Sequence, residues 1–327
     1  MIEATMLLAL GFAVTFASLP RIMELMMKRG VAGRDVHKKE KPIVPEMGGL
    51  AVLLGLVVCC IVGIYLIPEK ASVFVSFLAT VLIAGAIGAV DDLVTLNARV
   101  KPFLMTFASL PILILGTYTP SIVFPYMGAS RLTKVYPLLI PIVMAVTSNG
   151  VNMMDPFNGT MSGSCTILTF SLFLSAILMG RGDGVLLSAT LLGVLLAFFW
   201  FNKYPSRVFS GDVGSLSIGA AIGAIAILGR LEVVAVVAFM PQIMNAFYGL
   251  STVGRLYERR EVARPVTILE DGRLMATADP KAPLTLARFV LARGPLYEKE
   301  AAYVILVLSA ISGLLALITT YLIVVTT

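Results

Sequence analysis

Histidine and cysteine are scarce in this chain of 327 residues. His37 is the one histidine, which excludes a catalytic or metal site built on a histidine cluster. The three cysteines lie in apolar runs, and Cys59 and Cys60 are adjacent, so the sequence predicts neither a disulfide framework nor a zinc motif.

Charged residues are also few, at 13%, whereas 58% of the residues are hydrophobic. A soluble domain of this size needs no such excess for its core, so the composition indicates a polytopic membrane protein. The N-terminus does not resemble a cleavable signal, because Glu3 precedes the apolar run and the basic residues follow it. The net charge of +6 is typical of basic loops beside membrane spans, and we expect no nucleic-acid partner.

Apolar runs of about 17 to 25 residues predict an all-α membrane protein with ten transmembrane helices, forming a single integral membrane domain over 1–327. The predicted spans are 4–27, 47–67, 72–90, 102–117, 136–154, 162–180, 185–202, 213–229, 231–253 and 300–325. The fourth is the weakest, since it is short and carries two prolines. Of the 25 Lys and Arg residues, 19 fall in loops on one side of this topology. This asymmetry places those loops in the cytoplasm and both termini outside.

Polar residues occur at the inner end of the fifth predicted span. Asn149, Asn152 and Asp155 are spaced three apart, so they would share one helix face until Pro156 ends the helix. Polar groups in membrane segments usually face a polar cavity or a partner, so this stretch is a candidate site.

Two acidic stretches emerge on the same predicted side. Asp91 and Asp92 follow the third span and could bind a divalent cation or position a nucleophile, with Lys101 holding phosphate; a solvated helix end is the alternative. Asp212 follows Gly211 at the start of the eighth span and could be a ligand or an ordinary helix N-cap. Hard oxygen ligands without histidine or cysteine indicate Mg²⁺ or Mn²⁺ beside phosphate groups.

Two further patterns have simpler explanations available. The basic loop 254–299 could contact an anionic substrate, but attraction to anionic lipid accounts for most of its arginines equally well. Small residues at four-residue spacing in the eighth span, including Gly219 and Gly223, predict close helix packing.

Five motifs occur in order along the chain. They are Pro45-Glu46-Met47-Gly48-Gly49, Asp91-Asp92 with Lys101, Asn149-x-x-Asn152-x-x-Asp155-x-x-Asn158-Gly159, Asn202-x-x-Pro205-Ser206-x-Val208-Phe209-x-Gly211-Asp212 and Gly294-Pro295-Leu296-Tyr297-Glu298. Together they resemble the polyprenyl-phosphate N-acetylhexosamine-1-phosphate transferase family over essentially the whole chain. The last two motifs most resemble the eukaryotic and archaeal branch, which makes N-acetylglucosaminyl-diphospho-dolichol.

The resemblance implies transfer of N-acetylglucosamine-1-phosphate, or a related sugar phosphate, from a UDP-sugar to dolichyl or polyprenyl phosphate with release of UMP. This would be the first step of lipid-linked oligosaccharide synthesis. The implied metal is Mg²⁺, with Mn²⁺ as an alternative, on Asn152 and Asp212. The implied catalytic residues are Asp91, Asp92, Lys101 and Asp155, and the implied substrate-binding residues are Glu46, Asn149, Asn158 on the uracil, and Arg264.

The chain departs from the family pattern at two places. The bacterial cell-wall branch has a histidine-rich segment in the last cytoplasmic loop, whereas loop 254–299 offers Arg264-Pro265, which argues against a muramyl-pentapeptide substrate. Pro156 stands where family members often have glycine.

Two other classes of function compete with a transferase. A lipid-carrier flippase or transporter would also carry intramembrane Asn and Asp residues, but its polar groups must be reached from both faces, whereas these gather on one. A structural scaffold leaves them unexplained. The compact loops favour an archaeal plasma membrane over the endoplasmic reticulum, and a homodimer is left open.

Overall fold

The computed structural model describes residues 1–254, 256 and 261–327, and the described chain is mostly helical. Its helices are α1 (Ile2–Lys28), α2 (Gly49–Leu66), α3 (Ala71–Val94), α4 (Val100–Thr106), α5 (Leu110–Leu115), α6 (Tyr136–Met153), α7 (Thr160–Leu178), α8 (Gly182–Asn202), α9 (Gly211–Leu228), α10 (Glu232–Ala238), α11 (Met240–Val253), α12 (Leu286–Val290) and α13 (Glu298–Thr326). Short 3₁₀ turns occur at Pro68–Lys70, Phe107–Ser109 and Leu291–Arg293.

Three small antiparallel hairpins add to the predicted all-α fold. They pair β1 (Ala32–Arg34) with β2 (Ile43–Pro45), β3 (Ser121–Phe124) with β4 (Gly128–Arg131), and β5 (Val266–Ile268) with β6 (Leu274–Ala276). The predicted loop 254–299 thus contains a hairpin and the helix α12 where the structure describes it.

Helices coincide with all ten predicted spans, but fewer of them meet the length and composition of a membrane span. In the described part of the chain, seven helices are long and apolar enough, or eight if the bent pair α10 and α11 is one span. The predicted span 102–117 is divided into α4 and α5 by the turn Phe107–Ser109. In α6, the predicted span 136–154, polar residues such as Asn149 and Asn152 lower the hydropathy. The chain is an integral membrane protein, and the ten-span topology stays a prediction.

The helix α9 lies at the centre of the bundle. In its apolar 18-residue stretch, 89% of the residues are buried, a larger share than in any other described candidate span. The helix packs against α3, α6 and α2. Small residues make these contacts close: a Cβ atom on Gly219 would lie 2.5 Å from the Cα of Ser148, and one on Gly49 would lie 2.1 Å from the Cα of Gly214. The predicted close packing of the eighth span is therefore confirmed.

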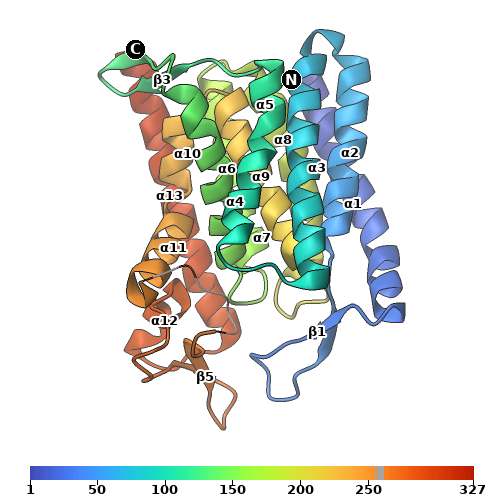
Figure 1. The fold of residues 1–327 in the computed structure, drawn as a ribbon, viewed down its shortest axis with the longest axis vertical. Coiled ribbons are helices and arrows are strands. Elements are labelled where there is room, and N and C mark those ends of the chain that lie inside the picture. Colours follow the sequence, from blue (N-terminus) through green and yellow to red (C-terminus); the bar gives the residue numbers. More distant parts are fainter. Residues whose placement is uncertain (255, 257–260) are drawn as a thin grey trace.

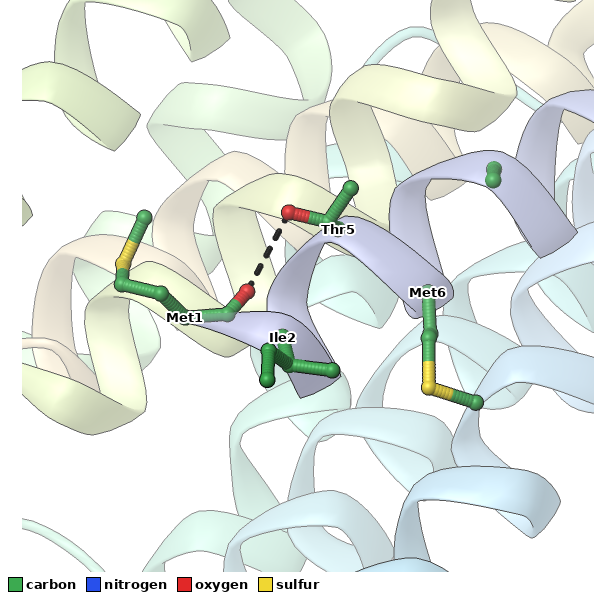
Figure 2. A pocket seen from close by; sticks show the side chains of 5 residues that line it. Met1, Ile2, Thr5 and Met6 are labelled. Atoms are coloured by element: carbon green, nitrogen blue, oxygen red, sulfur yellow. Dashed lines mark hydrogen bonds between the residues drawn. The ribbon is translucent and has the colours of Figure 1, made fainter.

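The two ends of the bundle differ in what they carry. Figure 1 shows both termini and β3 at one end, and β1, β5 and α12 at the other. The ends of α3 and α6 and the start of α9 meet at this second end, which we call the loop end. A hollow of about 390 Å³ lies near the N-terminus, lined by Met1, Ile2, Thr5, Met6 and Ala9 (Figure 2). Its lining is mostly apolar and offers no group for phosphate chemistry.

Candidate active site

Asp212 is the meeting point of three helices at the loop end. Its Oδ1 accepts a hydrogen bond from Nδ2 of Asn152 on α6 at 2.8 Å, and its Oδ2 accepts one from Nζ of Lys101 on α4 at 2.6 Å. Gly211 allows this placement, because its φ of +66° begins α9 with a turn that favours glycine. Lys101 and Asn152, which belong to separate sequence motifs, thus both contact Asp212.

Asp92 holds the start of α9. Its Oδ1 accepts the backbone N–H of Asp212 at 2.7 Å, and its Oδ2 accepts that of Val213 at 2.9 Å. The alternative of Asp212 as a helix N-cap is therefore wrong, since the residue before the helix is Ser210 and Asp92 supplies the acceptor. The carboxylate also lies at the positive end of the α9 dipole, which offsets its unfavourable position at the C-terminal end of α3.

Asp91 is paired with Lys101. Its two carboxylate oxygens accept hydrogen bonds from the backbone N–H of Leu96 and from the Lys101 ammonium. Because Asp91 is buried, the alternative of a solvated helix end is wrong for this residue. Lys101 thereby lies between two carboxylates, those of Asp91 and Asp212.

The predicted shared face of Asn149, Asn152 and Asp155 is only partly correct. The helix α6 ends at Met153, so Asp155 lies beyond it, as the proline that follows requires. Asp155 still reaches the site, because its Oδ2 accepts a hydrogen bond from Oγ of Ser210 at 3.1 Å. Asn149 donates from Nδ2 to the carbonyl of Ala145 in its own helix at 2.8 Å.

The motif before α2 lies against the segment before α9. The backbone N–H groups of Gly48 and Gly49 donate to the carbonyls of Phe209 and Ser210, both at 2.9 Å. Glu46 lies beside this junction, and burial, with a smaller contribution from the charge of Asp92, raises the pKa of its carboxyl.

The Asn-x-x-Pro-Ser motif has a structural role. Asn202 is buried, donates from Nδ2 to the carbonyl of Val208 at 2.9 Å, and accepts at Oδ1 from Oγ of Ser162 at 2.6 Å. Ser206 also donates to the carbonyl of Val208, at 2.8 Å. These hydrogen bonds close the loop between α8 and α9 and so position Asp212.

A second polar cluster surrounds Asn158. Its Nδ2 donates to Oδ2 of Asp35 at 2.9 Å, and its backbone N–H donates to Oε1 of Glu298 at 3.0 Å. Lys38 forms ion pairs with both carboxylates, at 3.7 Å in the case of Glu298. Sequence reasoning missed Asp35 and Lys38, because they lie in a mostly basic loop whose charged residues show no regular spacing.

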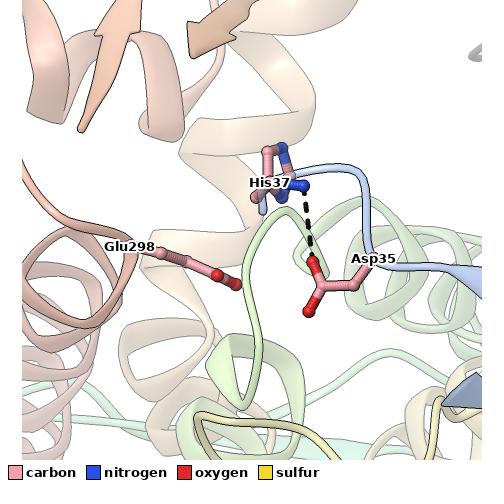
Figure 3. A group of neighbouring side chains, drawn as sticks. All are labelled: Asp35, His37 and Glu298. Carbon is pink, nitrogen blue, oxygen red and sulfur yellow. Dashed lines mark hydrogen bonds between the residues drawn. The ribbon is translucent and has the colours of Figure 1, made fainter. Parts of the chain in front are cut away.

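His37 lies beside this cluster (Figure 3). One ligand atom from each of Asp35, His37 and Glu298 lies within 4.8 Å of the others, a spacing that could hold a metal ion. However, the Lys38 ammonium already provides a cation for the two carboxylates.

The structure does not bring every predicted residue to Asp212. Arg264 is exposed just before β5, and among the described residues its side chain makes no hydrogen bond or ion pair. Arg255, Arg259 and Arg260 of the predicted basic loop lie outside the described residues.

Asp212 and Asn152 carry oxygen donors of the kind that Mg²⁺ prefers. The two side chains are in direct contact, so their oxygen donors are close enough to fit one divalent cation. Together with Lys101, whose ammonium is the kind of group that binds phosphate, these groups suit a reaction between anionic substrates.

Comparisons with known proteins identify the family of this chain. The glycosyl transferase family 4 model matches residues 74–230. A putative glycosyltransferase of Methanocaldococcus jannaschii is 32% identical over 290 residues, which cover 88% of this chain and 87% of the relative. A putative UDP-N-acetylglucosamine–dolichyl-phosphate N-acetylglucosaminephosphotransferase of Sulfolobus acidocaldarius is 30% identical over 242 residues, covering 72% and 74% of the two chains.

A bacterial relative is similar to the same degree. The phospho-N-acetylmuramoyl-pentapeptide-transferase of Moorella thermoacetica is 31% identical over 253 residues, which cover 72% of this chain and 78% of the relative. The resemblance seen in the motifs is confirmed by these matches, and the chain belongs to glycosyl transferase family 4.

Proposed function

We propose that this protein transfers N-acetylglucosamine-1-phosphate from UDP-N-acetylglucosamine to dolichyl or polyprenyl phosphate and releases UMP. The observation that carries the proposal is the convergence of Lys101, Asn152 and Asp212 from three helices at one end of a membrane bundle. A lipid phosphate lies at the membrane surface, so a site at a bundle end is where it can meet a water-soluble nucleotide sugar.

The choice of sugar rests on relatives and on one absence in the sequence. The Sulfolobus relative is named for transfer of N-acetylglucosamine phosphate to dolichyl phosphate. The region 254–299 contains no histidine, unlike the bacterial cell-wall branch that the motifs resemble less. N-acetylglucosamine is therefore favoured over a muramyl-pentapeptide.

Asp212 and Asn152 would hold Mg²⁺, or Mn²⁺, whose charge would neutralise the diphosphate of the donor and stabilise the departing UMP. Lys101 would bind phosphate oxygens beside them. Asp155, just after α6, would keep Ser210 and the start of α9 in place, because its carboxylate accepts a hydrogen bond from Oγ of Ser210 at 3.1 Å.

The acceptor needs little help from a base. The second pKa of a phosphate monoester is about 6, so a lipid phosphate is mostly dianionic near neutral pH and can attack phosphorus directly. Neither Asp91 nor Asp92 has an oxygen without a hydrogen bond or ion pair. We therefore assign both to positioning: Asp92 orients the helix that carries Asp212, and Asp91 orients Lys101.

The donor would extend from this centre to the second cluster. Asn158 would contact the uracil, with Glu46, Asn149 and Arg264 as further substrate contacts and the region 254–299 covering the sugar. The ten-span topology with both termini outside would put this site in the cytoplasm, where nucleotide sugars are made. An archaeal plasma membrane is the proposed location.

A lipid-carrier flippase or transporter is not favoured. The site residues gather at one end of the bundle, and the relatives are named as transferases. Purified protein with Mg²⁺, a panel of UDP-sugars and several polyprenyl or dolichyl phosphates provides the test. The expected result is UMP release matched by lipid-linked N-acetylglucosamine; no product from any pair would refute the proposal.

A further inference from the structure

Asn158 is held from two sides by carboxylates of distant segments. Asp35, between β1 and β2, accepts from its side-chain Nδ2, and Glu298, at the start of α13, accepts from its backbone N–H. Figure 3 shows Asp35 and Glu298 on either side of a loop. The two hydrogen bonds place Asn158 between these carboxylates. Both the backbone and the side chain of Asn158 are therefore fixed.

The charge of Asp35 decides which way the Asn158 amide faces. Burial raises the pKa of the Asp35 carboxyl, but hydrogen bonds from Lys38 and Asn158 outweigh this effect, and the net pKa lies below its ordinary value. An ionised carboxylate can only accept hydrogen bonds, so the amide must turn its NH₂ group toward Asp35. Its oxygen then faces away from Asp35.

We propose that Asp35 is a positioning residue that presents the Asn158 amide oxygen to the nucleotide base and thereby selects uracil over cytosine. The ring N3 of uracil carries a hydrogen and donates, whereas the ring N3 of cytosine is a bare acceptor. An amide oxygen that faces ring N3 therefore accepts a hydrogen bond from uracil and is repelled by the lone pair of cytosine. The proposal rests on the proposed function, in which Asn158 contacts the base.

Lys38 contributes charge to this cluster but makes no hydrogen bond to Asn158 that would orient its amide. It pairs with Asp35 and with Glu298, and so balances the charge of the cluster. A glutamine in its place keeps a hydrogen-bond donor for Asp35 and deletes no hydrogen bond of Asn158. Selection of the base should therefore depend on Asp35 much more than on Lys38.

The test compares binding of UMP and CMP to the purified full-length protein by titration calorimetry. We expect wild type to prefer UMP by about 100-fold or more, since a site built around one hydrogen bond rejects the analogue that lacks it. Asp35→Asn should lower this preference at least about tenfold, because the amide introduced by this substitution accepts either orientation of Asn158. Lys38→Gln should keep most of the preference. Glu69→Gln, at an exposed carboxylate in the turn Pro68–Lys70, is the matched control and should keep all of it.

An unchanged UMP preference in folded Asp35→Asn protein would overturn the proposal, as would an equal loss in Lys38→Gln. If Asp35→Asn does not fold, the exchange variant with Asp35→Asn and Asn158→Asp carries the test. It keeps the hydrogen bond with donor and acceptor exchanged and still presents an oxygen, so UMP should stay preferred; loss of that preference in the folded variant would count against Asp35. The proposed function fails separately, if wild type releases no UMP from UDP-sugars.

Discussion

The Asp92 carboxylate binds the backbone N–H groups of Asp212 and Val213, at 2.7 and 2.9 Å, across 120 residues of sequence or more. A Cβ atom on Gly211 would lie only 2.6 Å from Oδ2 of Asp92, so the carboxylate packs directly against the first turn of α9. The end of α3 thus determines where the Asp212 carboxylate lies.

Asp92→Asn should lower both stability and turnover without changing the shape of the pH–rate profile. The amide keeps one acceptor and turns a donor toward the second N–H group, which costs about 1–3 kcal/mol. Thermal unfolding and kcat/KM between pH 5 and 9 measure the two effects. A loss of the acidic limb of the profile would instead identify Asp92 as a general base, contrary to the positioning role.

Asp212→Ala should remove nearly all turnover, by a factor of about 100 or more, because it deletes the carboxylate on which Lys101 and Asn152 converge. UMP release by the purified variant measures this loss, with Glu69→Gln as the control for an exposed acidic residue outside the site. Near-normal turnover in folded Asp212→Ala protein would exclude the proposed metal ligand.

Lys101→Met should raise the KM for the nucleotide sugar roughly tenfold, because the variant keeps the length of the side chain but loses its phosphate-binding charge. Steady-state kinetics with both substrates varied give the comparison. Lys134→Met, at an exposed lysine between β4 and α6, is the matched control. A fall in kcat with unchanged KM would place Lys101 outside phosphate binding.

Glu46 should make stability depend on pH. Because its pKa is raised in the folded protein, the folded state binds the proton more tightly than the unfolded state, and stability falls as pH rises from the ordinary value of 4.5 through the raised pKa. Glu46→Gln removes this dependence, so its melting temperature relative to wild type should increase over that window and then level off. A constant difference across the window would contradict burial as the cause.

Gly49→Ala should destabilise the protein by about 1–3 kcal/mol, because the added Cβ would meet the Cα of Gly214 at 2.1 Å in a backbone contact that cannot yield easily. Gly182→Ala is the control, since a Cβ there meets no atom within 4 Å and lies at the start of a helix. Thermal unfolding in detergent compares the pair. Equal melting temperatures would show that α2 and α9 can separate at little cost.

Much of the site was predictable because its residues differ in type from the apolar residues expected in a membrane helix. Asn152 is polar in an apolar run, and Asp212 follows a glycine where a helix begins; either fact is visible in a few neighbouring residues. For Asp155 the prediction was correct in part. Pro156 disfavours helix at Asp155, as expected, but α6 already ends at Met153, so Asp155 does not share a helix face with Asn149 and Asn152.

The sequence by itself determined where apolar helices form and which polar groups they carry, because hydropathy and proline act over a turn or two of chain. Only the tertiary structure decided that Asp92 holds the start of α9, that Lys101 lies between two carboxylates, and that Asp35 orients Asn158. Those partners are between 10 and 123 residues apart. Their meeting depends on how close the helices approach, which no local pattern specifies.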